Sequence, residues 1–273
     1  MTAAAVPMTR HAEHVMGTVF SFDVRGDGDH RDGIGRAVAW LRHVDAVFST
    51  YRPDSPVSRL GRGEIGLTNC PAEVAEVLAL CARVERDSGG YFTAHPPGGR
   101  LDPSGLVKGW AIERASDLLT AAGLPRHSVN GGGDVQLGAE PEPGRPWRVG
   151  VAAPPTAAGR PADGALATVV AGAGLAVATS GTAERGHHIV DPHTGRPATA
   201  LASITLAGPR LTTVDAYATA AFAMGEAARD WVEDMEDLEA LAVTAAGQTW
   251  RTSGFHRHVP PEFRGFLPAW PPR

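Results

Sequence analysis

The chain has 273 residues, of which 43% are hydrophobic, and a formal net charge of −5 at pH 7 with a sequence pI of about 6.1. No block of Lys and Arg occurs, so the sequence lacks the basic footprint expected of a nucleic-acid-binding protein. No apolar run approaches the ~18 residues needed to cross a bilayer, and the N-terminus lacks the continuous apolar core of an export signal. We therefore expect a protein without a membrane span, located in the cytoplasm.

The chain contains two cysteines, Cys70 and Cys81. They have no partners at the spacing of a zinc site, and two cysteines in a chain of this length make no disulfide framework. We expect both thiols to be reduced. Because Cys81 stands among Leu78, Leu80 and Val84, it is expected to lie in the core.

The first part of the chain predicts one strand and three helices. Residues 14–24 alternate apolar and polar side chains around Val and Phe, a pattern typical of a strand. Apolar positions recur at helical spacing from Ile34 to Phe48, and the following segment 49–63, rich in Ser, Pro and Gly, is expected to be a surface loop. Two further helices are expected at 71–87 and 110–122, separated by an irregular stretch rich in glycine.

The second part of the chain predicts short strands between glycine- and proline-rich loops. A helix from Thr213 to Met224 ends at Gly225, since glycine is the residue type that most often follows a helix. An acidic helix over 226–237, a closing hairpin over 238–251 and a proline-rich tail from Pro260 follow it. The strands before Thr213 are expected at 128–130, 134–137, 147–151, 167–170, 175–178, 187–190 and 202–206.

This order of elements predicts a fold class. Helices and strands mingle without the strict alternation of a βαβ fold, and no segment repeats at the period of a solenoid or propeller. We therefore predict the α+β class, with mixed sheets and flanking helices. A single domain is expected to span residues 1–273.

The helix expected at 213–224 carries Asp215 and Thr219 on one face. Residues four positions apart stack one turn from each other on a helix, so this carboxylate and this hydroxyl can address one ligand. Oxygen donors of this kind are the ligands that Mg²⁺ prefers. For an isolated Asp/Thr pair, two polar residues on a half-exposed helix are the more frequent explanation.

Two glycine-containing motifs favour anions. In VNGGGDV, at 129–135, successive glycine amides can cradle an anion, although a tight β-turn is the favoured interpretation of that motif alone. In LDPSGLVKGW, at 101–110, backbone amides, the Ser104 hydroxyl and the Lys108 ammonium lie at a helix N-terminus, which attracts negative charge. An ordinary capped helix start explains the second motif equally well.

The histidines His187, His188 and His193 leave two interpretations open. A zinc site from all three is possible, but neither a His-Glu-x-x-His helix nor a cysteine partner supports it. A single cleft histidine that acts as acid or base is better supported, because an unperturbed pKa of ~6.5 suits proton transfer near neutrality. The neighbouring Thr-Ser-Gly at 179–181 lacks the Gly-x-Ser-x-Gly pattern of a hydrolase nucleophile.

The motifs gain specificity from their order along the chain. Met16-Gly17-Thr18, Ser49-Thr50-Tyr51, LDPSGLVKGWA, VNGGGDV and PWRVGVAAP are followed by ATSGTAER, HHIVDPHTGRP and TVDAYATAAFAMG. Over roughly residues 15–225 this succession resembles the ApbE family, the FAD:protein FMN transferases. The resemblance implies an ApbE-like fold and magnesium-dependent cleavage of FAD, with FMN moved onto a Thr or Ser hydroxyl of an acceptor flavoprotein and AMP released.

The same resemblance implies roles for individual residues. It implies that the metal ion is held by the Gly105 backbone carbonyl together with Asp215 and Thr219, and that His188 activates the acceptor hydroxyl. It implies an FAD site lined by Met16, Tyr51, Asp102, Lys108, Gly132, Gly133, Asp134 and His188.

This sequence also departs from the family's pattern. Phe92 is followed by Thr93 where relatives usually have Asp, and the connection from 95 to 100 is short. Both changes affect the expected flavin-side wall of the pocket. Many relatives are exported lipoproteins, whereas this sequence shows no export signal.

The sequence leaves three alternatives open. A magnesium-dependent FAD pyrophosphatase would use the same site with water in place of the acceptor. A non-catalytic FAD-binding protein would not need the metal pair Asp215 and Thr219. A redox flavoenzyme finds no support in a nicotinamide fingerprint.

Overall fold

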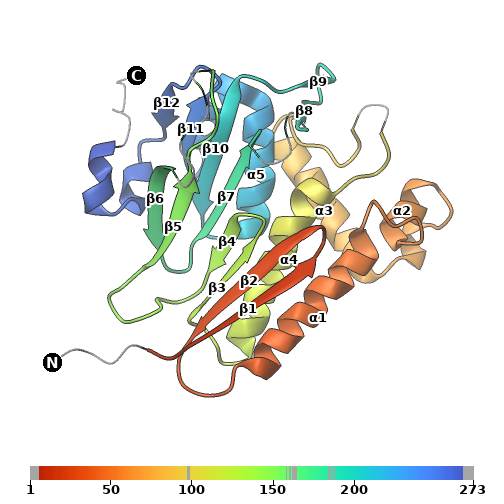
Figure 1. The fold of residues 1–273 in the computed structure, drawn as a ribbon. Coiled ribbons are helices and arrows are strands. Elements are labelled where there is room, and N and C mark those ends of the chain that lie inside the picture. The colour runs from red at the N-terminus through yellow and green to blue at the C-terminus, as the bar shows by residue number, and fades with distance from the viewer. Residues whose placement is uncertain are drawn as a thin grey trace.

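An eight-stranded sheet forms the centre of the protein (Figure 1). The computed structural model describes residues 6–96, 99–157, 159, 161, 165–183, 186 and 188–266, with only the backbone of Phe266. The sheet has the order β1-β2-β3-β4-β7-β10-β11-β12. Its strands are β1 (Met8–Val15), β2 (Thr18–Arg25), β3 (His127–Gly131), β4 (Asp134–Leu137), β7 (Ala176–Gly181), β10 (Leu201–Gly208), β11 (Glu239–Thr244) and β12 (Thr249–Arg251).

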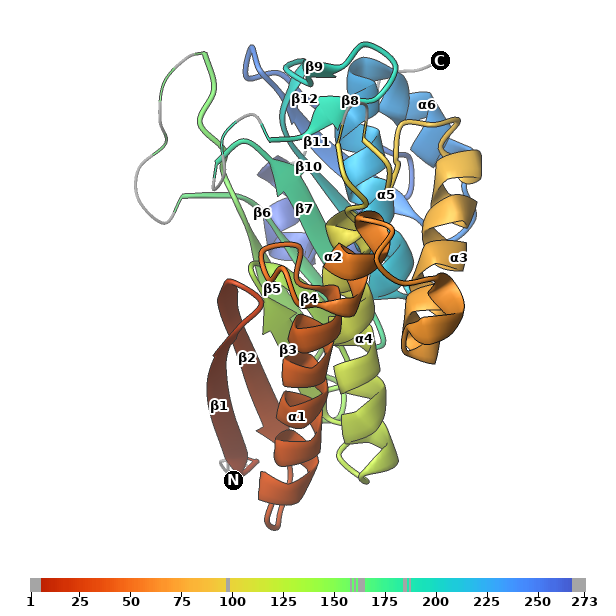
Figure 2. The same ribbon diagram turned by 90° about the vertical axis from the view of Figure 1, so that its right-hand side faces the viewer.

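Helices cover one face of this sheet (Figure 2). Helices α1, α4 and α5 lie along the sheet, and α3 lies outside them. Short 3₁₀ turns follow α2, α5 and β12 along the chain. The helices are α1 (Arg31–Phe48), α2 (Pro56–Gly61), α3 (Ala72–Asp87), α4 (Ser104–Ala121), α5 (Leu211–Met224) and α6 (Ala228–Glu233).

A two-stranded ribbon covers part of the opposite face. It consists of β5 (Trp147–Ala152) and β6 (Leu166–Gly172), and a second, shorter ribbon joins β8 (Val190–Asp191) to β9 (Arg196–Pro197). Alternation along the central strands explains the two layers. On β10, for example, Leu206 belongs to the core under the helices and its neighbour Ala207 to the core under β5 and β6, because successive strand residues point to opposite faces.

The α+β class with flanking helices is confirmed. Within it, each strand pair of the described residues is antiparallel, so no parallel pair of a mixed sheet occurs there. The predicted helices at 34–48, 71–87 and 213–224 are found, as are all the predicted strands from 128 onward except 187–190. Cys70 and Cys81 are free thiols as predicted, and Cys81 is buried.

The predicted strand at 14–24 is wrong, because the structure forms a hairpin there. Val15 pairs with Thr18 across a two-residue turn in which Met16 and Gly17 have φ angles of 54° and 73°. Two positive φ angles are typical of the type I′ turn that matches the twist of a hairpin. The sequence does not predict the first strand of this hairpin, β1, because its exposed edge carries His, Glu and Arg side chains. These residue types do not produce the alternation of apolar and polar side chains by which a strand is predicted.

Two helices begin where loops were predicted. Helix α2 lies within the segment 49–63, where the Ser55 hydroxyl accepts a hydrogen bond from the Ser58 amide at 3.1 Å and Pro56 occupies the first helical turn; both are N-terminal helix signals. Helix α4 begins at Ser104 and not at residue 110. Gly105 and Gly109 are part of this helix and do not interrupt it.

Two further predictions near the C-terminal half are wrong in extent. The strand at 187–190 shrinks to Val190–Asp191, and His187 lies outside the described residues. The helix at 226–237 reduces to a 3₁₀ turn and α6, which ends at Glu233. Like charges at helical spacing in the following acidic stretch disfavour its continuation. Among the residues described, no helix combines the length and apolar character needed to cross a bilayer.

Candidate active site

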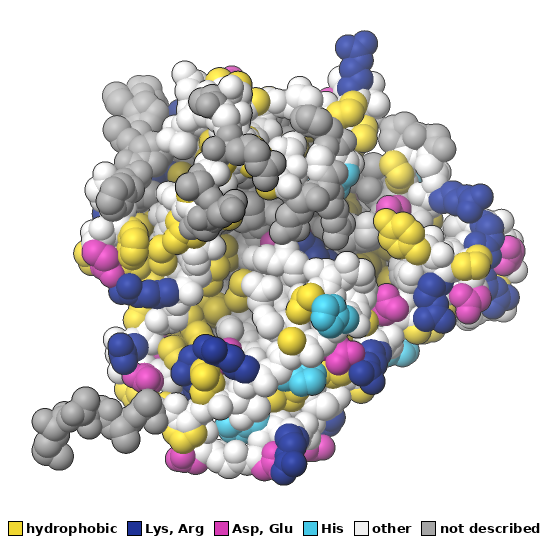
Figure 3. All heavy atoms as spheres, viewed as in Figure 1, with side chains coloured by type: hydrophobic (Ala, Val, Ile, Leu, Met, Phe, Trp, Pro, Cys, Tyr) yellow, Lys and Arg dark blue, Asp and Glu magenta, His cyan; other side chains and the backbone are white. Residues whose placement is uncertain are grey.

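The site is a cavity of about 510 Å³ between the helices, the sheet and the β5–β6 ribbon. The face drawn in Figure 3 is hollowed near its centre, and hydrophobic side chains gather on the β5–β6 side of the hollow. A cavity of this size is within the usual range for a bound small molecule or cofactor. Its lining comes from residues 91–93 and 96, Asp102 and the start of α4, the β3–β4 turn, β5 and the loop after it, β7 and the residues after it, the segment with His188 and Pro192, β10 and α5.

The β3–β4 turn places Asp134 at the floor of the cavity. Gly131 pairs with Asp134 across a two-residue turn. The turn residues Gly132 and Gly133 have φ angles of 59° and 90°, a backbone region that glycine adopts without steric cost. The triple glycine therefore works as the tight hairpin turn that we favoured for that motif alone, and it leaves the first residue of β4 beside the cavity.

The N-terminus of α4 contributes Asp102, Ser104, Gly105 and Lys108 to the lining. Asp102 Oδ1 accepts a hydrogen bond from the Ser104 amide at 3.0 Å, which satisfies one of the free amides at a helix start. Gly105 is tightly enclosed, since a Cβ atom there would lie 3.1 Å from a ring carbon of Phe92 and 3.8 Å from the Thr219 methyl group.

Gly109 brings α4 against α5. A Cβ atom at this position would lie 2.5 Å from the Leu211 carbonyl oxygen and 2.7 Å from the Asp215 Cβ. The Gly109 amide donates to Asp215 Oδ2 at 2.9 Å. Only glycine fits this crossing, and the close approach is what lets a backbone amide hold the carboxylate.

Two buried side chains hold the start of α5. Gln136 Oε1 accepts from the Leu211 amide and Glu113 Oε2 from the Thr212 amide, both at 2.9 Å. Arg210 pairs with the other oxygen of Glu113 at 2.5 Å. Helix starts need acceptors for their free amides, and here β4 and α4 supply them. The helix that carries Asp215 and Thr219 is therefore fixed at its N-terminus by two neighbouring elements.

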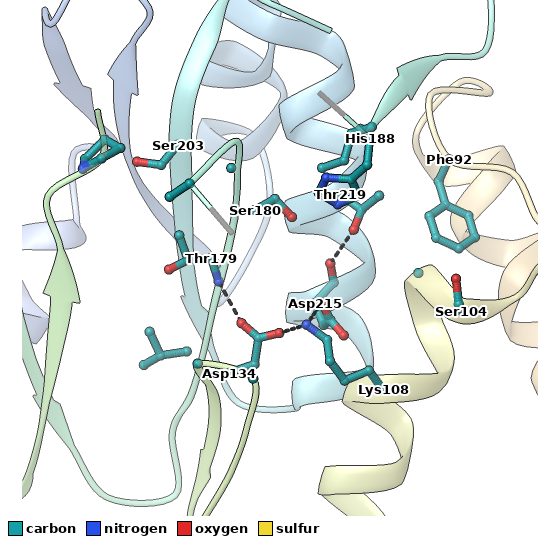
Figure 4. Close-up of a pocket in the computed structure, with 18 of the residues that line it drawn as sticks. Phe92, Ser104, Lys108, Asp134, Thr179, Ser180, His188, Ser203, Asp215 and Thr219 are labelled. Atoms are coloured by element: carbon teal, nitrogen blue, oxygen red, sulfur yellow. Dashed lines mark hydrogen bonds and ion pairs between the residues drawn. The ribbon is translucent and has the colours of Figure 1, made fainter. Parts of the chain in front are cut away.

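Two buried carboxylates and a half-buried ammonium group lie at the centre of the site (Figure 4). Lys108 hydrogen-bonds to Asp134 Oδ2, and its ammonium lies 3.4 Å from Asp215 Oδ1. The side chains of Asp134 and Asp215 are 1% and 6% exposed, respectively. Because two carboxylates share one ammonium group, the set holds an excess of negative charge.

The environment shifts the pKa of two of these groups. Burial opposes the charge of Lys108, but the carboxylates of Asp215 and Asp134 outweigh it and raise the pKa of the ammonium group. Burial raises the pKa of Asp215 to about 7, an effect that Lys108 opposes and Asp134 reinforces. A perturbed acid in a cavity is a candidate functional group, and a bound cation would favour its charged form.

The donor atoms around Asp215 fit a hard divalent cation. Thr219 lies one helical turn away, and its hydroxyl donates to the Asp215 carbonyl at 3.3 Å. The Gly105 position lies against Thr219 from the opposite helix. Carboxylate, hydroxyl and carbonyl oxygens are the ligand types that Mg²⁺ accepts, and the excess negative charge of the set suits a cation. Within the described part of the chain, no group of three or more His, Cys, Asp and Glu side chains could form a metal site.

His188 lies at the cavity with its side chain exposed. Its Nδ1 lies 3.1 Å from the Gly186 carbonyl oxygen, which accepts a hydrogen bond only from a protonated Nδ1. In the neutral imidazole this contact places the proton on Nδ1, so that Nε2 is the nitrogen able to accept a proton. His193 packs its ring on Tyr91 at 4.6 Å between centroids, and among the described residues, which do not include His187, it belongs to no group of metal ligands.

The structure brings most of the residues implied by the resemblance to this one cavity. Met16 and Tyr51 are not part of its lining. Met16 lies half-buried in the β1–β2 turn, and Tyr51 is 97% exposed. The residues implied by the resemblance that do line it are Asp102, Gly105, Lys108, Gly132, Gly133, Asp134, His188, Asp215 and Thr219.

Sequence reasoning missed several residues of the site. Ser203 lines the cavity with Thr179 and Ser180, and Gln136 and Glu113 hold α5. Of these three hydroxyl side chains, only Thr179 and Ser180 are indicated by the sequence, through the Thr-Ser-Gly at 179–181. Phe92 and Thr93, at the departure from the family pattern, both line the cavity.

Comparison with known proteins places this geometry in context. A sequence model described as the ApbE family matches residues 16–96 and 92–242. A Rhodobacter capsulatus FAD:protein FMN transferase is 30% identical over 257 residues, which are 90% of this chain and 43% of that protein. A Vibrio cholerae protein of the same name is 27% identical over 176 residues, 61% of this chain and 50% of that protein. The chain therefore spans about half the length of these curated relatives.

Solved structures support the fold. The apo crystal structure of Pseudomonas stutzeri flavinyl transferase ApbE superposes with a TM-score of 0.78 at 24% identity, covering 95% of this chain and 99% of that one. At this identity the likeness is evidence for the fold alone, and it agrees with the α+β architecture described above.

Proposed function

The chain belongs to the ApbE family, and from that premise we propose that it is a magnesium-dependent FAD:protein FMN transferase. It binds FAD, moves FMN onto a Thr or Ser hydroxyl of an acceptor flavoprotein and releases AMP. The observation that carries the proposal is one cavity that combines a buried excess of negative charge at Asp215 with an exposed histidine, His188, whose Nδ1 is held by the Gly186 carbonyl.

The proposed reaction replaces the phosphoanhydride bond of FAD with a phosphoester bond to the acceptor. The acceptor hydroxyl oxygen bonds to the phosphorus of the FMN half of the pyrophosphate, and the bond from that phosphorus to the bridging oxygen breaks. The bridging oxygen and its electron pair leave with AMP. His188 Nε2 takes the hydroxyl proton, a contribution typically worth ~10²–10⁴-fold in rate.

Mg²⁺ would be held by Asp215, Thr219 and the Gly105 carbonyl. When bound, it would neutralise charge on the pyrophosphate, which is the main requirement of phosphoryl transfer. Gly109 and the two caps of α5 keep Asp215 in place for that task. Lys108 at the start of α4 adds positive potential toward the phosphates.

A second candidate function is hydrolysis of FAD to FMN and AMP. It is favoured by the exposure of His188, because water can reach the position that the acceptor hydroxyl would take. A non-catalytic FAD-binding role is less well supported, since flavin binding alone needs no buried metal ligand set.

Purified protein incubated with FAD and Mg²⁺, with and without an FMN-binding acceptor domain, tests the proposal. AMP release and the intact mass of the acceptor are followed together. We expect an FMN-sized mass gain on the acceptor that EDTA abolishes. AMP without a mass gain would support the hydrolase, and neither product with a competent acceptor would contradict both catalytic functions.

Two features of the protein stay predictions from its sequence. One is its organisation as a single domain over residues 1–273, and the other is its cytoplasmic location. The acceptor's Thr or Ser segment likewise belongs to the proposal.

A further inference from the structure

Asp134 differs from the other residues of the cavity because the protein already occupies both of its carboxylate oxygens. Oδ1 accepts from the Thr179 amide at 2.9 Å, and Oδ2 binds the Lys108 ammonium. With 1% of its surface exposed, this side chain has little left to offer a substrate. Its position in the cavity floor therefore needs an explanation other than FAD contact.

Lys108 divides its charge unequally between two acids. Its hydrogen bond goes to Asp134, whereas Asp215 Oδ1 lies 3.4 Å away, beyond the ~2.7–2.9 Å of a close charge-assisted hydrogen bond. The other oxygen of Asp215 is held by the Gly109 amide. Asp215 Oδ1 is thus the one carboxylate oxygen of the set without a close donor among the described residues.

A lysine beside a single buried carboxylate would form a full ion pair with it. The Coulomb energy of such a pair grows as the dielectric constant falls, so an ammonium group held against a buried carboxylate competes directly with a metal ion for the same oxygen. We propose that Asp134 is a positioning residue that draws the Lys108 ammonium off Asp215 and so leaves Asp215 Oδ1 open to a divalent cation. This inference rests on the cation site of the proposed function.

The proposal predicts that the affinity for a divalent cation increases with the net negative charge of Lys108, Asp134 and Asp215 taken together. Two carboxylates and one ammonium leave one negative charge in the wild-type protein. Asp134→Asn removes that excess and gives Lys108 a single acid partner, Asp215. The double variant Asp134→Asn/Lys108→Met restores one negative charge and removes the competitor. Lys108→Met alone leaves two negative charges.

Calorimetric titration with Mg²⁺ alone, at about pH 8 and without FAD, measures the Mg²⁺ affinity of the wild type and of these variants directly. We expect Asp134→Asn to bind Mg²⁺ at least ~10-fold more weakly than wild type, the double variant to recover most of that loss, and Lys108→Met to bind more tightly. Glu239→Gln is the matched control, because Glu239 is also a buried acid paired with a basic residue but does not line the cavity; its Mg²⁺ affinity should equal that of wild type.

Recovery in the double variant distinguishes positioning from a merely structural role, since a second substitution does not repair a damaged fold. Wild-type affinity in Asp134→Asn, or a double variant as weak as the single one, would overturn the inference. If the wild type binds no Mg²⁺, both the inference and the proposed cation site are wrong. If the affinities follow the prediction but no AMP or flavinylated acceptor forms, the inference stands and the proposed function does not.

Discussion

Two buried acids of this protein, Asp215 and Glu239, have opposite surroundings. Glu239 has its own base, with Arg257 at 2.7 Å, and also accepts from the Thr252 hydroxyl and from the Gly254 amide at 3.0 Å. Asp215 shares Lys108 with a second acid and faces a cavity. A buried charge without full compensation costs stability. The fold completes the charge balance at Glu239 and leaves it open at Asp215, and this difference is what supports the proposed cation site at Asp215.

The largest expected effect on FMN transfer follows from removal of Asp215, the acid that shares its basic partner with Asp134. Asp215→Ala should lower FMN transfer by ~10³-fold, since electrostatic stabilisation of this size depends on a positioned charge, and the residual rate should no longer respond to Mg²⁺. Acceptor mass is measured over a Mg²⁺ series. A variant whose rate still rises with Mg²⁺ would place the cation elsewhere.

Removal of the His188 imidazole should have the second-largest effect on FMN transfer. His188→Ala should keep FAD affinity within about twofold but lower transfer by at least ~10²-fold, because it removes the proton acceptor and leaves the cation site intact. Flavin fluorescence gives the affinity and acceptor mass gives the rate. Transfer at the wild-type rate would assign the proton to another group.

The contact that holds Asp215 can be tested by a pair of glycine variants. Gly109→Ala places a methyl group 2.5 Å from the Leu211 carbonyl, so we expect a loss of ~1–3 kcal/mol in the free energy of unfolding and weaker Mg²⁺ binding. Gly35→Ala, in α1 with nothing within 4 Å of the added atom, should gain ~0.5–1 kcal/mol. Equal denaturation midpoints for the two variants would contradict the close helix crossing.

Substitution of Glu239, the acid with its own basic partner, should lower the stability of the fold without changing the rate of FMN transfer. Glu239→Gln weakens the hydrogen bonds and ion pair that hold the segment after β12, so we expect a loss of ~1–2 kcal/mol in the free energy of unfolding. Transfer at a temperature where the variant is folded should match wild type. Urea denaturation and acceptor mass measure the two quantities, and a slowed reaction with normal FAD binding would connect this region to the active site.

The residues that sequence could predict are those whose relation is local. Asp215 and Thr219 share a helix face because of spacing alone, and Gly132 and Gly133 form a turn because of their own backbone preferences. These positions needed no knowledge of the rest of the chain.

What sequence could not predict depends on distant parts of the chain meeting. Lys108 and Asp134 come from α4 and β4, and Gly109 reaches Asp215 over more than a hundred residues. No periodicity predicts these pairings, since they arise from how α4 packs beside α5 on one face of the sheet. In the same packing Gly105 and Gly109, which fall in the stretch predicted to be irregular, are part of α4.

Tyr51 is where the sequence-based site and the structural one differ most, and it gives the smallest expected effect. The motif around it implies a place in the FAD site, but the side chain is 97% exposed and does not line the cavity. Tyr51→Ala should therefore change FAD affinity by less than about twofold, because the substitution removes no side chain from the cavity lining. Quenching of flavin fluorescence measures this, with Lys108→Met as the variant that should weaken FAD binding. A tenfold loss in Tyr51→Ala would mean that the segment between α1 and α2 closes over bound FAD, and the motif would then be the better guide to the bound state.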